Sequence, residues 1–296
     1  MEPVRPEFAP DPDLSRDEMT ALQREVAEAA VFADDFAFDP ADVTASHVPP
    51  EAVTGVDETL SAGGASAGPD TEPDPPGEAT DDADSPATGE SVETNRPLIA
   101  GVDQAFLDDH AVSAVVLLRG SRVVERVYAV TELSTPYIPG LLSFREGGPI
   151  IDALSALDRD PDLLVFDGSG RIHYRQAGLA THMGVVFDTP SVGVAKNLLC
   201  GTPAESVTDR PAGWRTPIHA DADVDAAPGT VIGHAYQSRQ YDTNRTINPL
   251  YVSPGHRVSA ETTVELVAAV GGKYKLPEPT RLADAYADEV KRDLSE

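Results

Sequence analysis

The chain has 296 residues, which is enough for one large domain or two small ones. Its formal net charge is −28, and charge alone favours an acidic protein that never meets nucleic acid. The single cysteine, Cys200, excludes an intramolecular disulfide, and no apolar run approaches the roughly 20 residues that span a bilayer. The first residues lack the basic and apolar regions of a signal peptide, so we expect a cytoplasmic protein without a membrane segment.

The negative charge is unevenly distributed along the chain. Residues 1–95 contain 24 Asp and Glu against three Arg, a net charge of −21, and residues 96–296 carry −7. The whole chain has four lysines. This pattern is typical of a salt-rich cytoplasm, where surface carboxylates hold water, and it indicates a halophilic organism. At ~1 M salt the Debye length is about 3 Å, so repulsion between these acids and DNA is largely screened.

The N-terminal part predicts one helix followed by an acidic insertion. Residues 15–32 are amphipathic, and Ser15 and Glu18 have the spacing of a capping box. We expect this helix, within residues 1–38, to pack on the main domain. Residues 39–95 hold 14 acids and no Lys or Arg. Such a segment buries too little apolar surface to offset its ordering entropy, so we predict that it is disordered.

Strand patterns begin after Arg96. Residues 98–106, 113–119 and 122–133 are rich in Val, Leu and Ala, and Gly120-Ser121 predicts a tight turn between the last two runs. Together the three runs predict an antiparallel meander. A helix is predicted over 146–157, and the wholly apolar run that follows at 163–166 predicts a strand buried on both faces.

The rest of the chain continues to alternate between helix and strand patterns. We predict helix, strand, strand and helix over 177–187, 191–195, 230–238 and 260–270, and a final helix that is capped by Thr280. This order predicts an α/β fold with a mixed central sheet, in which the antiparallel meander adjoins parallel strands and helices flank both faces. We therefore expect one compact domain over residues 96–296.

Three acids occupy positions that are unusual for a solvated face. Asp103 interrupts the apolar run Leu98–Val102, and Asp167 ends the next buried strand. Glu146 stands in Phe144–Pro149, where glycines leave room for close approach and a helix start favours an anion. For either aspartate alone, a solvent-facing strand end is the simpler interpretation, because the chain has 50 acids. Together the three can converge on Mg²⁺, which takes oxygen ligands and binds phosphate oxygens during phosphodiester hydrolysis.

Several longer motifs resemble those of the endonuclease V family. They follow in the family's order and are Pro136–Glu146, Phe166–His173, Gly178–His182, Val192–Lys196, Tyr251–Arg257 and Pro279–Asp284. The opening helix also matches around residues 22–25, and the resemblance covers about residues 98–285. It implies an RNase H-like fold and a Mg²⁺-dependent enzyme, with Mn²⁺ as a substitute, from a halophilic archaeon. Such enzymes nick DNA at the second phosphodiester bond 3′ to deoxyinosine, the deamination product of adenine.

The resemblance also implies catalytic roles for individual residues. By position, Asp103, Glu146 and Asp167 are the metal-binding carboxylates. His256 matches a histidine near the metal, where it would ligate a second ion or position water. Lys196 matches a lysine close to the scissile phosphate.

Other matched residues would recognise the damaged base. Tyr137, Ile138 and Pro139 correspond to the family's wedge, an apolar blade that replaces lost stacking while the target base swings into a pocket. Outside the family context, the Pro-Tyr-Ile-Pro sequence would be interpreted as an ordinary rigid loop. Gly140 and Gly168 would line the pocket, where backbone groups approach the hypoxanthine edge and exclude the amino group of adenine.

Polar residues in the motif loops are candidates for contacts to the substrate. His173 is expected either to contact the substrate or to hold a loop carbonyl. Tyr174 departs from the proline that the family commonly has, which puts the details of that loop in doubt. Fixed cations beside phosphates would position the strand, and each is also a candidate for an ordinary salt bridge. These cations are Arg145, Arg171, Arg175, Lys196 and Arg257.

Two other functions compete with cleavage of deoxyinosine DNA. The same fold and metals would serve an endoribonuclease specific for inosine in RNA, and a non-cleaving lesion-binding protein is the rival from another class. A serine hydrolase is poorly supported, because Gly168-Ser169-Gly170 lacks the Gly-x-Ser-x-Gly elbow. The sequence also has no Walker A loop and no zinc-type cluster of Cys and His. We expect a monomer whose partner is DNA that contains deoxyinosine.

Overall fold

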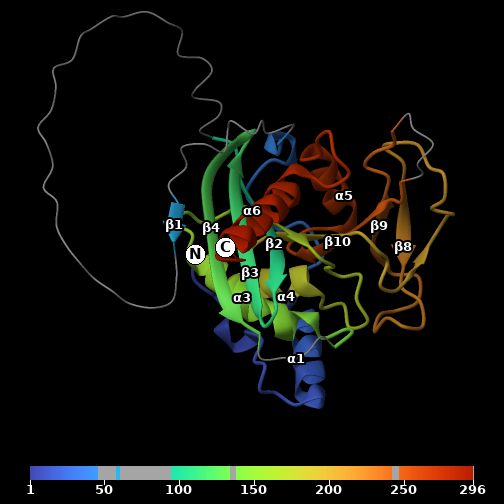
Figure 1. Cartoon of the computed structure of the whole chain (residues 1–296). Coiled ribbons are helices and arrows are strands. Elements are labelled where there is room, and N and C mark those ends of the chain that lie inside the picture. The colour runs from blue at the N-terminus through green and yellow to red at the C-terminus, as the bar shows by residue number, and fades with distance from the viewer. Residues whose placement is uncertain (46–57, 61–94, 134–137, 242–246, 296) are drawn as a thin grey trace, which may run out of the picture.

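The computed structural model describes residues 1–45, 58–60, 95–133, 138–241 and 247–295. Figure 1 shows a single large sheet with helices on both faces. The helices are η1 (Pro6–Phe8), α1 (Arg16–Ala29), η2 (Pro40–Asp42), α3 (Leu142–Ser155), α4 (Leu179–Phe187), α5 (Ala260–Ala269) and α6 (Glu278–Ser295). The strands are β1 (Glu58–Leu60), β2 (Leu98–Leu107), β3 (His110–Arg119), β4 (Arg122–Glu132), β5 (Leu163–Asp167), β6 (Ser191–Ala195), β7 (Thr202–Pro203), β8 (Arg215–His219), β9 (Val231–Tyr236) and β10 (Leu250–His256).

The strands form one mixed sheet in the order β1-β4-β3-β2-β5-β6-β10-β9-β8-β7. β2, β3 and β4 are antiparallel, which confirms the predicted meander, and Gly120 takes a φ of +59° in the turn between β3 and β4. β2, β5 and β6 are parallel neighbours. The predicted mixed sheet, with helices on both faces, is therefore confirmed.

Two apolar cores hold the helices against the sheet. One core packs α5 and α6 on one face, and Val264 and Leu282 belong to it. The other packs α3 and α4 on the opposite face, with Ile150 and Met183. In Figure 1, α6 lies across the central strands, whereas α1, α3 and α4 lie on the other side. We call the two faces the α6 side and the α3 side.

The predicted N-terminal helix is confirmed, with its cap. Ser15 Oγ accepts a hydrogen bond from the Glu18 backbone N–H, and the Glu18 carboxylate accepts one from the Ser15 N–H, so the capping box is complete. The N-terminal segment packs on α4, because the backbone N–H groups of Val4 and Arg5 donate to the Val186 carbonyl.

The predicted start of the acidic insertion at residue 39 is wrong. Residues 39–45 lie within the described structure, where η2 forms and Val43 and Ala45 are buried in the core of the α6 side. Apolar side chains at those two positions offset the ordering cost of a short acidic stretch. Residues 58–60 pair with β4 as the parallel strand β1. The rest of the insertion, 46–57 and 61–94, lies outside the described residues, so its predicted disorder stays a prediction.

Two predicted helix starts differ from the structure. α3 begins at Leu142 rather than at Glu146, and it includes Pro149 in its interior. Gly147 fits because Pro10 packs against it: an added Cβ would lie 2.6 Å from Pro10 Cγ. Thr280 does not cap α6, because that helix already begins at Glu278 and the Thr280 hydroxyl donates to the Pro277 carbonyl.

The central strand β10 was not predicted. Pro254 and Gly255 normally disfavour a strand interior, since proline lacks a donor and glycine lacks a side chain. In the structure β10 pairs with β6, and the register shifts between Pro254 and His256, so a bulge accommodates both residues. Among the described residues, no helix is long and apolar enough to cross a membrane.

Candidate functional site

Strand alternation places the two aspartates on the same face of the sheet. Val102 of β2 lies opposite Phe166 of β5 in a parallel pair, so Asp103 and Asp167 occupy the next two neighbouring positions. Val102 and Phe166 belong to the core of the α3 side. Because successive side chains alternate, the aspartates that follow them point to the α6 side.

Only one of the two carboxylate oxygens of Asp103 has a hydrogen-bond partner. Its Oδ1 accepts a hydrogen bond of 2.7 Å from the Gln104 backbone N–H. Its Oδ2 is buried and has no hydrogen-bond partner. Burial, followed by the negative charge of Asp167, raises the pKa of Asp103 to about 8. An ionised carboxylate in this position is costly unless a cation accompanies it.

Lys196 supplies one cation to the pair. It follows β6 directly, and its Nζ lies 2.6 Å from Asp167 Oδ2. Burial acts to lower the pKa of Lys196, but the hydrogen bond to Asp167 and the neighbouring aspartates outweigh it, so the pKa is raised. Lys196 therefore lies beside the acids, and its predicted place close to the scissile phosphate stays a prediction.

Asp284 is an acid of this site that the sequence reasoning did not single out. Its negative charge acts on the pKa of both Asp103 and Lys196, so α6 places it beside them. The side chain is exposed, whereas its neighbour Ala283 is buried in the core of the α6 side. The signal was available, because Asp284 ends the last of the matched motifs.

Glu146 lies on α3, on the other face of the sheet, where the charge of Asp167 acts on it. It lies one turn inside α3, and its backbone carbonyl accepts a hydrogen bond of 3.2 Å from Gln104 Nε2. Burial raises the pKa of Glu146 to about 7, Arg145 opposes this change, and the charge of Asp167 adds to it. The prediction that Glu146 stands at a helix start is wrong, because α3 begins four residues earlier.

The described residues contain no group of three or more His, Cys, Asp or Glu side chains arranged to hold a metal ion. The Lys196 ammonium binds Asp167, and Glu146 approaches from the opposite face. The aspartates still fit a divalent cation, because Asp103 Oδ2 is buried without a partner beside a second carboxylate. Carboxylate oxygens are the donors that Mg²⁺ prefers. A buried carboxylate oxygen without a partner destabilises the folded protein, and a bound cation would remove this cost.

His256 lies away from these acids, and its predicted catalytic role is not supported by its contacts. Its Nδ1 accepts a hydrogen bond from the Val31 N–H at 3.1 Å, and its Nε2 lies 3.1 Å from Asp188 Oδ1. Both ring nitrogens are therefore used inside the protein. Burial lowers the pKa of His256 even though Asp188 acts to raise it. The imidazole fastens the segment after α1 to β10.

The predicted wedge is described only in part. Tyr137 lies outside the described residues. Ile138 is half-buried and packs against the small apolar cluster formed by Met19, Leu141 and Phe144. Pro139 is exposed. The base of the loop is thus fixed on α1 and α3, with Pro139 at the surface.

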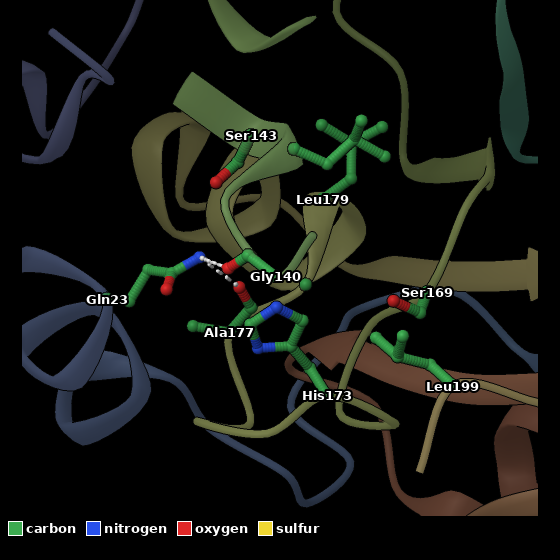
Figure 2. Close-up of a pocket in the computed structure, with 10 residues that line it drawn as sticks. Gln23, Gly140, Ser143, Ser169, His173, Ala177, Leu179 and Leu199 are labelled. Carbon is green, nitrogen blue, oxygen red and sulfur yellow. Dashed lines mark hydrogen bonds between the residues drawn. The ribbon is translucent and has the colours of Figure 1, made fainter. Parts of the chain in front are cut away.

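A small cavity of about 90 Å³ adjoins this loop. It lies on the α3 side, and it is lined by the predicted pocket residue Gly140 and by His173, a candidate for contact with the substrate (Figure 2). The residues that line it are Gln23, Gly140, Leu142, Ser143, Ser169, His173, Ala177, Gly178, Leu179 and Leu199. Its walls are mainly small or apolar, with a few polar groups, which is the character of a small-molecule or base pocket.

Gly140 is held by side chains from distant parts of the chain. Its carbonyl accepts hydrogen bonds from Gln23 Nε2 at 3.0 Å and from the Arg175 guanidinium at 2.8 Å. Figure 2 shows the Gln23 side chain reaching both Gly140 and Ala177. Gly140 has a φ of +78°, a region that favours glycine. These bonds fix the end of the wedge loop.

His173 is buried, and both of its expected roles stay predictions. Its Nδ1 accepts a hydrogen bond from the Arg175 backbone N–H at 3.3 Å. Burial and then the Arg175 charge lower the pKa of His173 to about 3, whereas hydrogen bonding to the Gly140 backbone acts in the opposite direction. The neutral ring therefore lines the cavity and supports Gly140. A direct contact to substrate stays a prediction.

Gly168 does not line the cavity among the described residues, although its neighbour Ser169 does. The Gly168 N–H donates to the Val194 carbonyl at 3.0 Å, which leaves it engaged with β6. The loop crosses β6 closely at Gly193, where an added Cβ would lie 2.5 Å from the Gly168 oxygen. Gly168 therefore helps to fix the close packing of this loop on β6, and its predicted place in the pocket stays a prediction.

Most of the arginines in the motif loops have partners within the protein. Arg171 Nε donates to Gln176 at 2.8 Å, and Arg257 pairs with Asp188 at 3.2 Å. The Arg145 guanidinium lies 5.5 Å from the centre of the Phe106 ring, and its buried Nε has no hydrogen-bond partner. Of these three, Arg145 keeps the most unused donor capacity, and it adjoins Glu146.

Comparison with known proteins gives one consistent result. The endonuclease V family model matches residues 85–285. Endonuclease V of Natronomonas pharaonis is 54% identical over 98% of both chains, and that of Haloarcula marismortui is 55% identical over 98% of this chain and 97% of its own. These sources confirm the expected halophilic archaeal origin.

Solved structures agree with these sequence matches. Endonuclease V of Streptomyces avermitilis covers 100% of both chains with a TM-score of 0.67 and 27% identity. The catalytic domain of human endonuclease V has a TM-score of 0.66 and 26% identity, and covers 94% of this chain and 97% of its own. The expected RNase H-like nuclease fold is confirmed by these neighbours. Sequence and structure together therefore show that this chain is a nuclease that belongs to the endonuclease V family.

Proposed function

We propose that this protein recognises deoxyinosine in DNA and hydrolyses the second phosphodiester bond 3′ to it in a reaction that needs a divalent cation. The observation that carries the proposal is the half-buried aspartate pair on β2 and β5, in which the Asp103 Oδ2 atom is buried without a partner. An aspartate pair that suits a divalent cation, in a domain that also holds a small cavity, fits a nuclease that holds one base and cuts the backbone.

Asp103 and Asp167 are the residues that would hold Mg²⁺, with Mn²⁺ as a substitute, and Glu146 and Asp284 lie next to them. When bound, the ion supplies Lewis-acid polarisation of a phosphoryl oxygen and neutralises the charge that develops there. Lys196 places a positive charge beside Asp167, where it would hold a phosphate oxygen of the substrate. Glu146, whose pKa is raised to about 7 by burial, is suited to hold or release a proton near neutral pH.

The cavity next to Gly140 is the proposed site of the flipped base. Its small and apolar walls would accept a purine ring, while Tyr137, Ile138 and Pro139 would replace the stacking that the base loses. A Ciona intestinalis endonuclease V of the same fold, with 20% identity and a TM-score of 0.62, was crystallised with a 24-mer DNA that contains an inosine followed by a ribo-adenosine. We carry that class of ligand over to this chain as part of the proposal. A cytoplasmic location and a monomeric state also stay predictions.

The test is a nicking assay at high KCl with a duplex that contains one deoxyinosine. We expect the wild type to nick it with Mg²⁺ and not with EDTA, and the product length to place the cut at the second bond 3′ to the lesion. The Asp167→Ala variant should lose turnover and keep its fold. Equal nicking by this variant would refute the assignment of the acids.

Matched substrates distinguish the alternative functions. Faster cleavage of an inosine-containing RNA than of the deoxyinosine duplex would show an endoribonuclease instead. Tight binding of the lesion in Ca²⁺, without any product in Mg²⁺ or Mn²⁺, would show a binding protein.

A further inference from the structure

The four lysines of this chain are not scattered. The chain has 50 acids and only four lysines, Lys196, Lys273, Lys275 and Lys291. Lys196 lies beside the catalytic aspartates, and Lys275 is close enough to it for the two charges to repel each other. Lys273 stands two residues before Lys275 in the segment 271–277, which leads into α6. Lys196 and Lys275 thus lie near each other, and Lys273 is the neighbour of Lys275 along the chain.

Side chains that follow β9 fix the backbone of segment 271–277. The Arg239 guanidinium donates to the carbonyls of Gly272 and, at 3.1 Å, of Lys273. Ser238 Oγ donates to the Lys275 carbonyl at 2.7 Å. Because both lysine carbonyls accept hydrogen bonds from Ser238 and Arg239, the backbone of the two lysines is fixed against the segment that follows β9.

The other end of the segment is seated on β2 next to the aspartates. A Cβ added to Gly101 would lie 2.0 Å from the Pro279 carbonyl oxygen, so the start of α6 rests directly on the strand at this glycine. Gly101 precedes Asp103 by two residues and lies on the same face of the strand. The lysines of the segment are therefore held at a fixed place relative to the site.

Lys275 stands in an environment that suits an anion. It is half-buried, and both burial and the nearby Lys196 charge lower its pKa. Within the described ranges, it forms no salt bridge, whereas Lys196 is paired with Asp167. Two cations held close together without a shared counter-charge cost free energy, and a phosphate that bridges them removes this cost.

We propose that Lys275 and Lys273 form a phosphate-binding surface that continues from Lys196 and holds the backbone of the nucleic-acid strand beside the cleaved bond. This inference rests on the proposed function, because it names how the same site takes hold of its substrate. Contacts of this kind position the strand and carry no base information. In a protein with a net charge of −28, they also provide local attraction for the DNA backbone at the site.

The test compares Lys275→Gln with Arg122→Gln by fluorescence anisotropy. Arg122 is an exposed cation at the start of β4, towards the β1 edge of the sheet, so its variant loses the same charge far from the site. Binding is measured in Ca²⁺ over a series of KCl concentrations, with a deoxyinosine duplex and with an undamaged duplex. Melting curves and Lys275→Arg show whether the fold and the charge are retained.

We expect Lys275→Gln to raise the dissociation constant about tenfold for both duplexes. The slope of log K against log salt should fall by about 1, with Lys275→Arg close to wild type. Lys273→Gln in addition should lower the slope further, and Arg122→Gln should leave both quantities unchanged.

Two results would overturn the inference. One is a Lys275→Gln variant that binds both duplexes with the affinity and salt slope of Arg122→Gln. The other is a loss confined to the deoxyinosine duplex, which would make Lys275 a reader of the base. Failure of the proposed function is distinguishable, because the wild type would then show no preference for deoxyinosine and no nicking. The undamaged duplex would still report on the lysines.

Discussion

Replacing Asp103 with asparagine separates the cost of a buried charge from its catalytic use. The asparagine side chain keeps the shape of aspartate and loses the charge. Without divalent cations at high pH, the wild type carries an ionised carboxylate whose Oδ2 is buried without a partner beside Asp167. The variant lacks this charge, so we expect it to be the more stable protein under those conditions and to be inactive as a nuclease.

The magnitude follows from the pKa of Asp103, which burial and then Asp167 raise from 3.8 to about 8. At 1.36 kcal/mol per unit this is a ceiling of about 6 kcal/mol. Because Asp103 keeps partial contact with solvent, we expect a stabilisation on the order of 2–3 kcal/mol. The folded state binds the proton more tightly than the unfolded state. The stability that protonated Asp103 contributes is therefore fully present below about pH 4 and is lost as the pH rises towards 8.

Urea unfolding at constant KCl measures this difference. In EDTA, the free energy of unfolding of the wild type should fall between about pH 5 and pH 8.5, and that of Asp103→Asn should fall less. Adding Mg²⁺ at about 100 times its dissociation constant should stabilise the wild type by about 2.7 kcal/mol and the variant much less. Asp108→Asn, an exposed acid in the turn between β2 and β3, is the control for loss of one charge.

Two outcomes would refute this reasoning. Identical pH dependence of wild type and Asp103→Asn would mean that the carboxylate is not held at a cost. Equal stabilisation of both proteins by Mg²⁺ would mean that the ion binds elsewhere.

Three further variants test other parts of the structure. Gln23→Ala removes one of the bonds to the Gly140 carbonyl, so we expect KM for the deoxyinosine duplex to rise several-fold with a smaller change in kcat; an unchanged KM would contradict the anchoring role. His256→Gln should lower the free energy of unfolding by about 1–3 kcal/mol and keep Mg²⁺-dependent nicking, whereas loss of nicking in the folded variant would restore its predicted catalytic role. Burial lowers the pKa of His182 to about 4, so the unfolded chain alone takes up this proton below about pH 6.5 and stability falls towards pH 4. His182→Gln should reduce that slope by up to about 1.4 kcal/mol per pH unit, and an identical slope in urea unfolding would argue against a buried neutral ring.

The sequence predicted the elements whose patterns are local. The meander, the strand that ends in Asp167 and the capping box at Ser15 all depend on residues that are neighbours in the chain. These features follow from periodicity and need no knowledge of distant contacts.

The features that sequence reasoning missed depend on tertiary contacts. β10 contains Pro254 and Gly255, which only a bulge against β6 makes acceptable in a central strand. His256 lies in a matched motif, yet its direction is set by Asp188, which is 68 residues away. Asp284 becomes part of the site only because α6 crosses the sheet next to Asp103. The matched motif that ends in Asp284 marks that residue, but no local pattern shows that it lies beside Asp103.

The proposed base recognition and the proposed cleavage take place on different sides of the sheet, and α3 contributes residues to both. Asp103 and Asp167 point to the α6 side, whereas the cavity lies on the α3 side. Ser143 of α3 lines that cavity, and Glu146 follows it by three residues, close to one helical turn. A base that enters the cavity would therefore contact the same turn of α3 that carries Glu146. Such an arrangement would make cleavage sensitive to what occupies the cavity, because a shift of α3 changes the distance from Glu146 to Asp167.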